Sequence, residues 1–434
     1  MVSPINEDEQ VVQSRHHPRR DQIRGAGYFS RIGPGIVTGA ADDDPSGIGT
    51  YSQVGAQFGY RFLWAAPVLL PFAFAIQETC ARIALVTGQG LARVIKRRMP
   101  NWVLFVTVFL VALANTVNIA ADLSSMAAVV TMFTPISQLF AVALIAALVG
   151  IAEILIPYHQ YAKVLRWLCL SLLSYVAVLV VANVDWQQVL VGLTHIDIGW
   201  NRFDIAAIIA IAGTTISPYL FFWQASVEVE EMNVKQKLFV NKRIIHEMEQ
   251  DVDFGMGFSG FVMYFIILTT GTVLYKSGIH QIDTVEQAAM ALKPLAGDMA
   301  YLLFAIGIIG TGLIAIPVLS GSLSYIFTET FGWEQGLNKK FHEAKGFYSI
   351  IAFSLIIGLS LNYVGISPID ALIYTAILYG MTAPVLIAII LHISNNKVIM
   401  GENTNSRLSN VLGIAALVIM TMASGALLYL EFIA

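Results

Sequence analysis

The chain has 434 residues, of which 56% are hydrophobic and only 12% are charged. Soluble domains carry about 25% charged residues, so this composition excludes an ordinary soluble enzyme and indicates a chain surrounded by lipid. The formal net charge of −4 gives no basic surface for nucleic acid, so no nucleic-acid partner is expected. Cys80 and Cys169 both lie within apolar runs, where they are expected to pack as small residues and not to form a disulfide framework.

Eleven apolar runs follow one another, most of them close to the roughly 20 residues that a membrane-spanning helix needs. They predict spans at residues 33–57, 62–86, 102–131, 138–156, 164–183, 204–231, 253–275, 299–328, 347–366, 369–394 and 409–431. Residues 1–32 are polar, contain the run RHHPRR and lack the apolar core of a signal peptide, so we expect a cytosolic tail there. The sequence predicts an all-α integral membrane protein.

The distribution of lysine and arginine sets the expected orientation. With the N-terminus in the cytoplasm, 20 of the 25 basic residues fall in inside segments and 4 in outside segments, while Arg82 lies within the second span. Inside loops of membrane proteins carry such an excess. We therefore expect a cytoplasmic N-terminus, an outside C-terminus and location in a bacterial inner membrane.

Two of the runs are interrupted near the middle of the membrane. The first contains AADDDPSG, where three consecutive aspartates precede Pro45, and the sixth contains GTTISPY, where Pro218 follows two threonines and a serine. A proline removes a backbone donor and pushes the residue before it out of helical geometry, which frees carbonyl groups. In the hydrocarbon region such groups are tolerated only where the backbone is buried in protein or lines a cavity.

The two interruptions occupy corresponding places. Pro45 and Pro218 are 173 residues apart, and five spans separate the starts of the two broken helices. Because five is odd, a second group of five spans would be inverted relative to the first. Paired interruptions in two such halves indicate a transporter binding site at the repeat interface, so we expect the two breaks to lie together.

Asp44 is the leading candidate ligand, because a mid-membrane carboxylate costs roughly 2.5–3.5 kcal/mol; capping of the helix that follows is the structural alternative. Asp42 and Asp43 either touch the ion or lie in a solvated vestibule. On the sixth span, Thr214 and Ser217 are candidate oxygen ligands, unless their hydroxyls bond back to the helix backbone. Such hard oxygen donors favour Mg²⁺, Ca²⁺ or Mn²⁺ over soft metals.

Four segments, GPGIVTGAADDDPSG, QETCARIALVTGQGLA, NIAADL and TTISPY, resemble the Nramp divalent-metal transporters in order and spacing. The resemblance implies a transporter domain over residues 33–431 with a LeuT-type fold. This fold consists of two inverted five-helix repeats, here at about 33–183 and 204–394, followed by an eleventh transmembrane helix at about 409–431. It also implies that a divalent metal ion binds between spans one and six and is carried by alternating access.

The chain departs from the family pattern where metal is bound. The family carries Asp-Pro-Gly-Asn in span one, and in span six an alanine whose carbonyl binds metal, followed by Met-Pro-His. Asp44 is retained, but glycine stands at the asparagine position and threonine at the alanine position, while the methionine and histidine are replaced by serine and tyrosine. These four residues are Gly47, Thr214, Ser217 and Tyr219. The changes imply a roomier oxygen site, similar to that of the divergent magnesium-type branch of the family, which also lacks the methionine.

The third span departs from the pattern as well. The family places a glutamate three residues after an aspartate, and both are tied to proton movement. Asp122 is kept here, but Ser125 stands at the glutamate position. Together with the loss of the histidine, this weakens the case for proton coupling and leaves Asp122 as either a relay or a structural carboxylate.

Other functions remain as alternatives. They are a proton-coupled Mn²⁺/Fe²⁺ importer of the ordinary Nramp type, an amino-acid carrier on the same fold, an intramembrane aspartyl protease using Asp44 and Asp122, and a non-transporting scaffold. A carboxylate at the break favours a cation over an amino acid, and no Gly-X-Gly-Asp pair supports a protease. We expect a transporter and not an enzyme, with the divalent ion and the bilayer as partners, no cofactor and no obligatory protein partner.

Overall fold

The computed structural model describes residues 34–156, 167–168, 170–234, 242–337 and 339–432. The expected tail at 1–32, the first residues of the fifth expected span and Cys169 lie outside these ranges. Within them the chain forms helices joined by turns and loops and contains no β-strand. The all-α prediction is confirmed.

The described helices, in chain order, are α1 (Pro34–Asp42), α2 (Pro45–Phe58), α3 (Ala65–Thr87), α4 (Leu91–Arg98), α5 (Asn101–Thr131), α6 (Gln138–Leu155), α8 (Ser174–Val181), α9 (Trp186–Thr194), α10 (Arg202–Thr215), α11 (Pro218–Val234), α12 (Lys242–Val273), α13 (Val285–Ala289), α14 (Lys293–Ala296), α15 (Ala300–Phe331), α16 (Lys345–Leu361), α17 (Pro368–Ser394), α18 (Lys397–Met400) and α19 (Arg407–Phe432). In this part of the chain, nine helical segments are long and apolar enough to cross a membrane, and they fall on nine of the predicted spans. The first predicted span is divided into α1 and α2, and the fifth is represented by the shorter apolar segment Leu170–Val181. The molecule is a multi-pass integral membrane protein.

Both predicted helix breaks are present. Helix α1 ends at Asp42 and α2 begins at Pro45, while α10 ends at Thr215 and α11 begins at Pro218. In both cases the proline is the first residue of the second half-helix, where its missing N–H costs nothing and its fixed φ suits the helical turn. The residues just before each proline are left out of the helices, as the steric rule for such positions requires.

Five short helices, α4, α9, α13, α14 and α18, lie outside the predicted spans. Helix α4 lies in the basic loop between the second and third spans, and its apolar side chains are buried while Lys96, Arg97 and Arg98 occupy its last turn. Basic residues at that end stabilise the helix because they face the negative end of its dipole. The apolar part of this loop is too short to cross a membrane, so the sequence pattern did not predict this helix.

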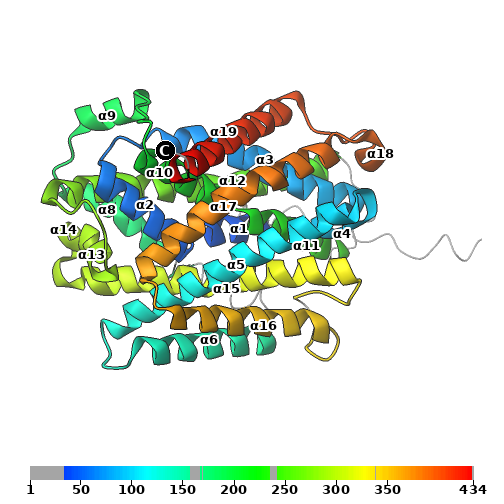
Figure 1. The fold of residues 1–434 in the computed structure, drawn as a ribbon, viewed down its shortest axis with the longest axis horizontal. Coiled ribbons are helices and arrows are strands. Elements are labelled where there is room, and N and C mark those ends of the chain that lie inside the picture. Colours follow the sequence, from blue (N-terminus) through cyan, green and yellow to red (C-terminus); the bar gives the residue numbers. More distant parts are fainter. Residues whose placement is uncertain (1–33, 157–166, 169, 235–241, 338, 433–434) are drawn as a thin grey trace, which may run out of the picture. The chain divides into compact units, whose positions relative to one another are not determined.

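The packing of the helices brings both breaks into the protein interior. Helices α1 and α2 contact α12, and α11 contacts α3, while α5 and α15 contact each other. Helices α6 and α16 contact each other and lie along one edge of the molecule in Figure 1, beyond α15. Helix α5 contacts α2 and α11, and α17 contacts α2 and α10, so these two helices face both broken helices.

Candidate functional site

The first break is organised by the Asp44 side chain. Its Oδ1 accepts a hydrogen bond from the backbone N–H of Gly47 at 2.6 Å, so Asp44 caps α2. Its Oδ2 accepts a second hydrogen bond from Asn118 Nδ2 on α5 at 2.8 Å. The carboxylate is only 2% exposed. The capping role that the sequence left open is therefore present. The carboxylate also joins α2 to α5 through Asn118.

Asp42 and Asp43 point towards α12. The hydroxyl of Ser259 donates to Asp42 Oδ2 at 2.5 Å and lies 3.2 Å from Asp43 Oδ1. The other oxygen of each carboxylate is buried and has no hydrogen-bond partner among the described residues. Both residues are buried and not solvated, so the alternative of an open, water-filled position does not describe this structure.

The hydroxyls of the second break bond to their own backbone. Ser217 Oγ donates to the carbonyl oxygen of Thr214 at 2.6 Å and to that of Gly213 at 3.2 Å. Thr215 Oγ1 donates to the Ile211 carbonyl at 2.7 Å and also lies 3.3 Å from the sulfur of Met263 on α12. The back-bonding expected of membrane-helix hydroxyls is therefore present at Ser217. It also stabilises the carbonyl groups that the break leaves without helical partners.

The two breaks meet. Tyr219 donates its hydroxyl hydrogen to the carbonyl oxygen of Ala41 at 2.8 Å, and the hydroxyls of Tyr51 and Thr215 lie 3.2 Å apart. A Cβ added at Gly47 would lie 3.3 Å from the Thr214 hydroxyl oxygen. The structure thus brings together the predicted residues from both broken helices, all of them buried.

The position of Gly47 differs from the expectation of a roomier site. A Cβ there would also lie 3.3 Å from the Asp42 carbonyl oxygen and 3.4 Å from the Tyr51 ring. The missing side chain therefore lets the two broken helices approach each other and does not leave open space. In this conformation the argument for a magnesium-type site must come from the chemistry of the donors and not from volume.

Helix α5 contributes a second polar face to the site. Asp122 is fully buried, and neither of its carboxylate oxygens has a hydrogen-bond partner in the described part of the chain. The carboxyl groups of Asp122 and Asp44 are close enough to interact electrostatically. Ser125 does not donate a hydrogen bond to the Asp122 carboxylate, because its hydroxyl donates to the Asp122 backbone carbonyl at 2.9 Å. Asn118, four residues earlier on the same face, was missed as a candidate, although this spacing from Asp122 was a signal that could have identified it.

The site gathers four buried carboxyl groups that have no basic partner among the described residues. Four aspartates, Asp42, Asp43, Asp44 and Asp122, are at most 2% exposed. None of the ion pairs among the described residues includes any of them. Buried carboxylates of like charge need protons or a cation to compensate them. No group of three or more His, Cys, Asp or Glu side chains within the described ranges is arranged as a metal cluster, so hydroxyl, carbonyl or water oxygens would complete the coordination of a cation.

An ion pair joins the two broken helices at one end. Arg61, just after α2, donates to Asp204 in the first turn of α10 and to Asp197 at 3.0 Å. The Asp204 side chain is 3% exposed and that of Arg61 29%. This contact joins the second half of the first broken helix to the first half of the second.

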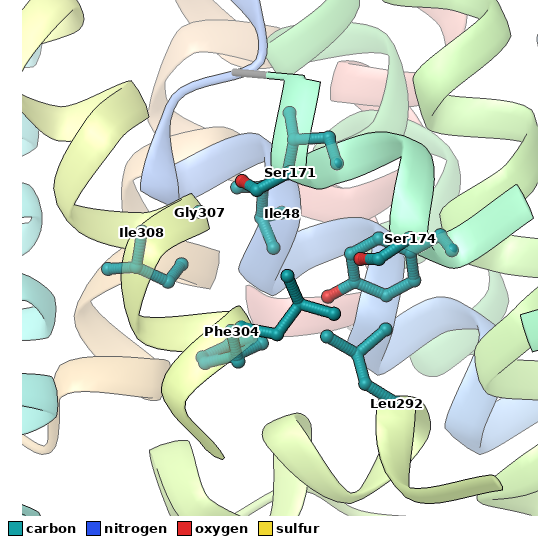
Figure 2. Close-up of a pocket in the computed structure, with 10 residues that line it drawn as sticks. Ile48, Ser171, Ser174, Leu292, Phe304, Gly307 and Ile308 are labelled. Carbon is teal, nitrogen blue, oxygen red and sulfur yellow. The ribbon is translucent and has the colours of Figure 1, made fainter. Parts of the chain in front are cut away.

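A small cavity lies one turn beyond the first break (Figure 2). It has a volume of about 10 Å³ and is lined by apolar side chains of α2 and α15, including Ile48, Phe304 and Ile308, together with Ser171 and Ser174. A volume of this size holds about one water molecule. The described residues that line it are apolar or carry hydroxyls, and the aspartates of the first break are not among them.

Comparisons with known proteins agree with this architecture. A family model described as "Natural resistance-associated macrophage protein-like" (Nramp) matches residues 35–430. A divalent metal cation transporter MntH from Caldanaerobacter subterraneus subsp. tengcongensis is 25% identical over 413 residues, which is 93% of each chain. The MntH of Yersinia enterocolitica serotype O:8 / biotype 1B is 25% identical over 404 residues, covering 89% of this chain and 91% of its own.

Solved structures show the same fold. A manganese transporter from Eremococcus coleocola superposes with a TM-score of 0.73 at 16% identity, covering 94% of this chain and 88% of its own. Mhp1, a nucleobase-cation-symport-1 family transporter, superposes with a TM-score of 0.54 at 14% identity, covering 91% and 92%. At these identities the likeness establishes the fold alone, and the predicted LeuT-type fold is confirmed.

Proposed function

Because this chain belongs to the Nramp family, we propose that it carries divalent metal cations across a membrane through a site between its two broken helices. The observation that carries this proposal is the meeting of the two breaks around buried aspartates that have no basic partner among the described residues. A cation that sheds part of its water would compensate this charge. The relatives are transporters and not enzymes, which favours transport over intramembrane proteolysis.

In this proposal Asp44 supplies the negative ligand. Each of its oxygens accepts one N–H and keeps further lone pairs for a cation. Thr214 and Ser217 supply carbonyl or hydroxyl oxygens from the second break, while Gly47 contributes by orienting Asp44 through its N–H. Asp122 lies on the α5 side of the same site.

Three further residues are assigned to the ion path and to its closure. Asp42 and Asp43 extend the negative charge from the break towards α12, where Ser259 donates to them. A path lined by one sign of charge raises the local concentration of the opposite ion. Tyr219 joins the two breaks in place of a titratable histidine, so it contributes to closure and not to proton transfer.

The proposed ion is Mg²⁺, Mn²⁺ or both. Oxygen donors suit both ions, and the serine at position 217 offers no thioether to select a softer metal. A second candidate is the ordinary proton-coupled Mn²⁺/Fe²⁺ importer, favoured by the sulfur of Met263 beside Thr215. Met263→Leu separates the two, because only the second predicts a selective loss of Mn²⁺ affinity. The amino-acid carrier has no corresponding support, since the carboxylates of the site have no basic partner in the part of the chain that the structure describes.

Movement of the ion would follow alternating access between two inverted repeats. We assign these repeats to residues 33–183 and 204–394, with 409–431 as an added helix, because α1 and α2 pack on α12 as α11 packs on α3. The proposed orientation places the N-terminus in the cytoplasm of a bacterial cell and the Arg61–Asp204 pair at the outer end.

The test is metal uptake into proteoliposomes that contain the full chain. Asp44→Asn keeps the volume and the capping ability of the residue but removes its charge, so uptake of Mg²⁺ and Mn²⁺ should be lost while the protein stays folded. Asp185→Asn is the matched control, because Asp185 also caps a helix, accepting from Gln188 N at 3.1 Å, but lies in an exposed loop. Full uptake by the Asp44 variant would refute the site.

A further inference from the structure

Asn118 and Gly47 bind different oxygens of the Asp44 carboxylate. Its Nδ2 donates to one carboxylate oxygen at 2.8 Å, while the N–H of Gly47 donates to the other at 2.6 Å. The two donors belong to different helices, α5 and α2, and both residues are buried. The carboxylate is therefore fixed in one orientation by a donor on each oxygen.

A carboxylate fixed in this way favours one mode of metal binding. Chelation through both oxygens, which Ca²⁺ commonly uses within its shell of 6–8 ligands, would bring the cation towards the hydrogens of both N–H donors. Contact through one oxygen keeps the cation away from the donor on the other oxygen. Mg²⁺ binds through few carboxylates in an octahedral shell and keeps several waters. The two N–H donors on the Asp44 carboxylate thus favour Mg²⁺ over the larger Ca²⁺.

The other end of the Asn118 amide supports the same conclusion. An ionised carboxylate only accepts hydrogen bonds, so the NH₂ group must face Asp44 and Oδ1 must point away from it. That Oδ1 is buried and has no partner among the described residues, and the same holds for both oxygens of Asp122, one turn further along α5. Water molecules bound to a cation point their hydrogens away from it. These buried oxygens could accept hydrogen bonds from such waters.

We propose that Asn118 is a positioning and selectivity residue of the transport site, which fixes Asp44 for contact through one oxygen and accepts a hydrogen bond from a cation-bound water. This inference rests on the proposed function. The chain would then prefer divalent cations that keep part of their water shell, such as Mg²⁺. It would bind less well the cations that carboxylates chelate, such as Ca²⁺.

The experiment compares Asn118→Leu and Asn118→Asp with Asn115→Leu. Asn115 is the matched control because it is equally buried one turn earlier on α5, and its partners among the described residues are the Leu319 carbonyl and the Tyr379 hydroxyl and not Asp44. Binding of Mg²⁺ and Ca²⁺ to the purified full chain is measured by calorimetry. Loss of a hydrogen bond to a charged group changes a binding constant about tenfold, so both Asn118 variants should lower the Mg²⁺-to-Ca²⁺ selectivity by about that factor. The control should lower thermal stability with the selectivity unchanged.

Cobalt(III) hexaammine probes the water contact, because its ligands do not exchange and it can bind only through them. It should compete with Mg²⁺ in the unsubstituted chain and compete less well in Asn118→Leu. An unchanged selectivity in Asn118→Leu, an equal change in the Asn115 control, or no competition by the cobalt complex would overturn the inference. If Asp44→Asn abolishes binding while the Asn118 variants keep the selectivity, only this inference fails; if the unsubstituted chain binds neither ion, the proposed function fails.

Discussion

The hydroxyl of Tyr219 donates a hydrogen bond to the carbonyl oxygen of Ala41 at 2.8 Å. This bond joins the first turn of α11 to the last turn of α1, so the second half of one broken helix holds the first half of the other. Tyr219 also packs against Tyr379, with the ring centroids 5.5 Å apart. The residue that stands at the family's histidine position therefore acts as a tether between the two breaks.

Tyr219→Phe should keep the ring packing and weaken metal binding. The change leaves the buried Ala41 carbonyl without its donor, which costs about 1–3 kcal/mol and allows the two breaks to separate. We expect a lower melting temperature and a metal affinity reduced by about tenfold, both measured on the purified protein. Tyr363→Phe is the control, since Tyr363 is 66% exposed. Unchanged affinity in Tyr219→Phe would show that the tether does not shape the site.

Ser217→Met should shift the ion preference towards softer metals. The substitution removes the hydroxyl that donates to Thr214 O and places a thioether at the second break, and thioethers favour softer ions. Competition of Cd²⁺ and Mn²⁺ against Mg²⁺ uptake measures the shift. Ser217→Leu matches the added volume without the sulfur. An equal shift in the leucine variant would mean that volume, and not the donor atom, sets the preference.

Gly39→Ala should separate α1 from α12. A Cβ at Gly39 falls against the backbone of Gly255, so one helix must move, and overpacking of this kind costs about 1–3 kcal/mol. We expect a lower melting temperature and slower uptake. Gly425→Ala is the control, because a Cβ there meets nothing within 4 Å; it should be neutral or stabilise α19 by up to about 1 kcal/mol. Equal melting temperatures for the two variants would contradict the close packing of α1 on α12.

Arg61→Met should favour opening at the end where Arg61 binds Asp204. The change removes the cation that compensates a nearly buried carboxylate, which makes the closed arrangement less stable. A cysteine introduced at Thr50, which is buried in α2, should then react faster with a membrane-impermeant thiol reagent. Combining the change with Asp204→Asn should restore part of the slow labelling, because no uncompensated charge remains. Labelling at the original rate in Arg61→Met would show that the Arg61–Asp204 ion pair does not stabilise the closed arrangement.

Metal uptake should proceed without stoichiometric proton movement. Ser125 and Tyr219 stand where the family has titratable side chains, and the Ser125 hydroxyl is occupied by the Asp122 carbonyl. Proteoliposomes that contain a pH-sensitive dye should take up Mg²⁺ with no change in internal pH. Acidification that accompanies uptake and disappears in Asp122→Asn would instead establish Asp122 as a proton carrier.

The sequence predicted the fold and the breaks well because both follow from strong local rules. Long apolar runs have one stable solution in a bilayer, and each proline begins a half-helix where expected, at Pro45 and at Pro218. Helix α12 begins at Lys242, before the predicted start at 253. The prediction missed its first turns because they are polar and partly exposed. Hydropathy does not detect a helix that continues outside the membrane.

The details of the site depend on contacts between distant segments, which one sequence does not provide. Asn118 binds Asp44 across 74 positions of the chain, and Ser259 binds Asp42 across 217. The spacing of Asn118 from Asp122 places both on one face of α5, but it does not show which residue of another helix Asn118 binds, and Ser259 has no such local signal. The expectation of extra space at Gly47 was wrong for this conformation, since the loss of a side chain allowed closer helix packing instead.

The most direct test of the central claim is the position of a bound metal ion. Crystals of the full chain soaked in Mn²⁺ would give an anomalous difference signal wherever the ion binds. We predict one dominant peak between the α1–α2 break and the α10–α11 break, in contact with the Asp44 carboxylate directly or through one water. A dominant peak elsewhere, with Asp44 still bound only to Gly47 and Asn118, would contradict the account.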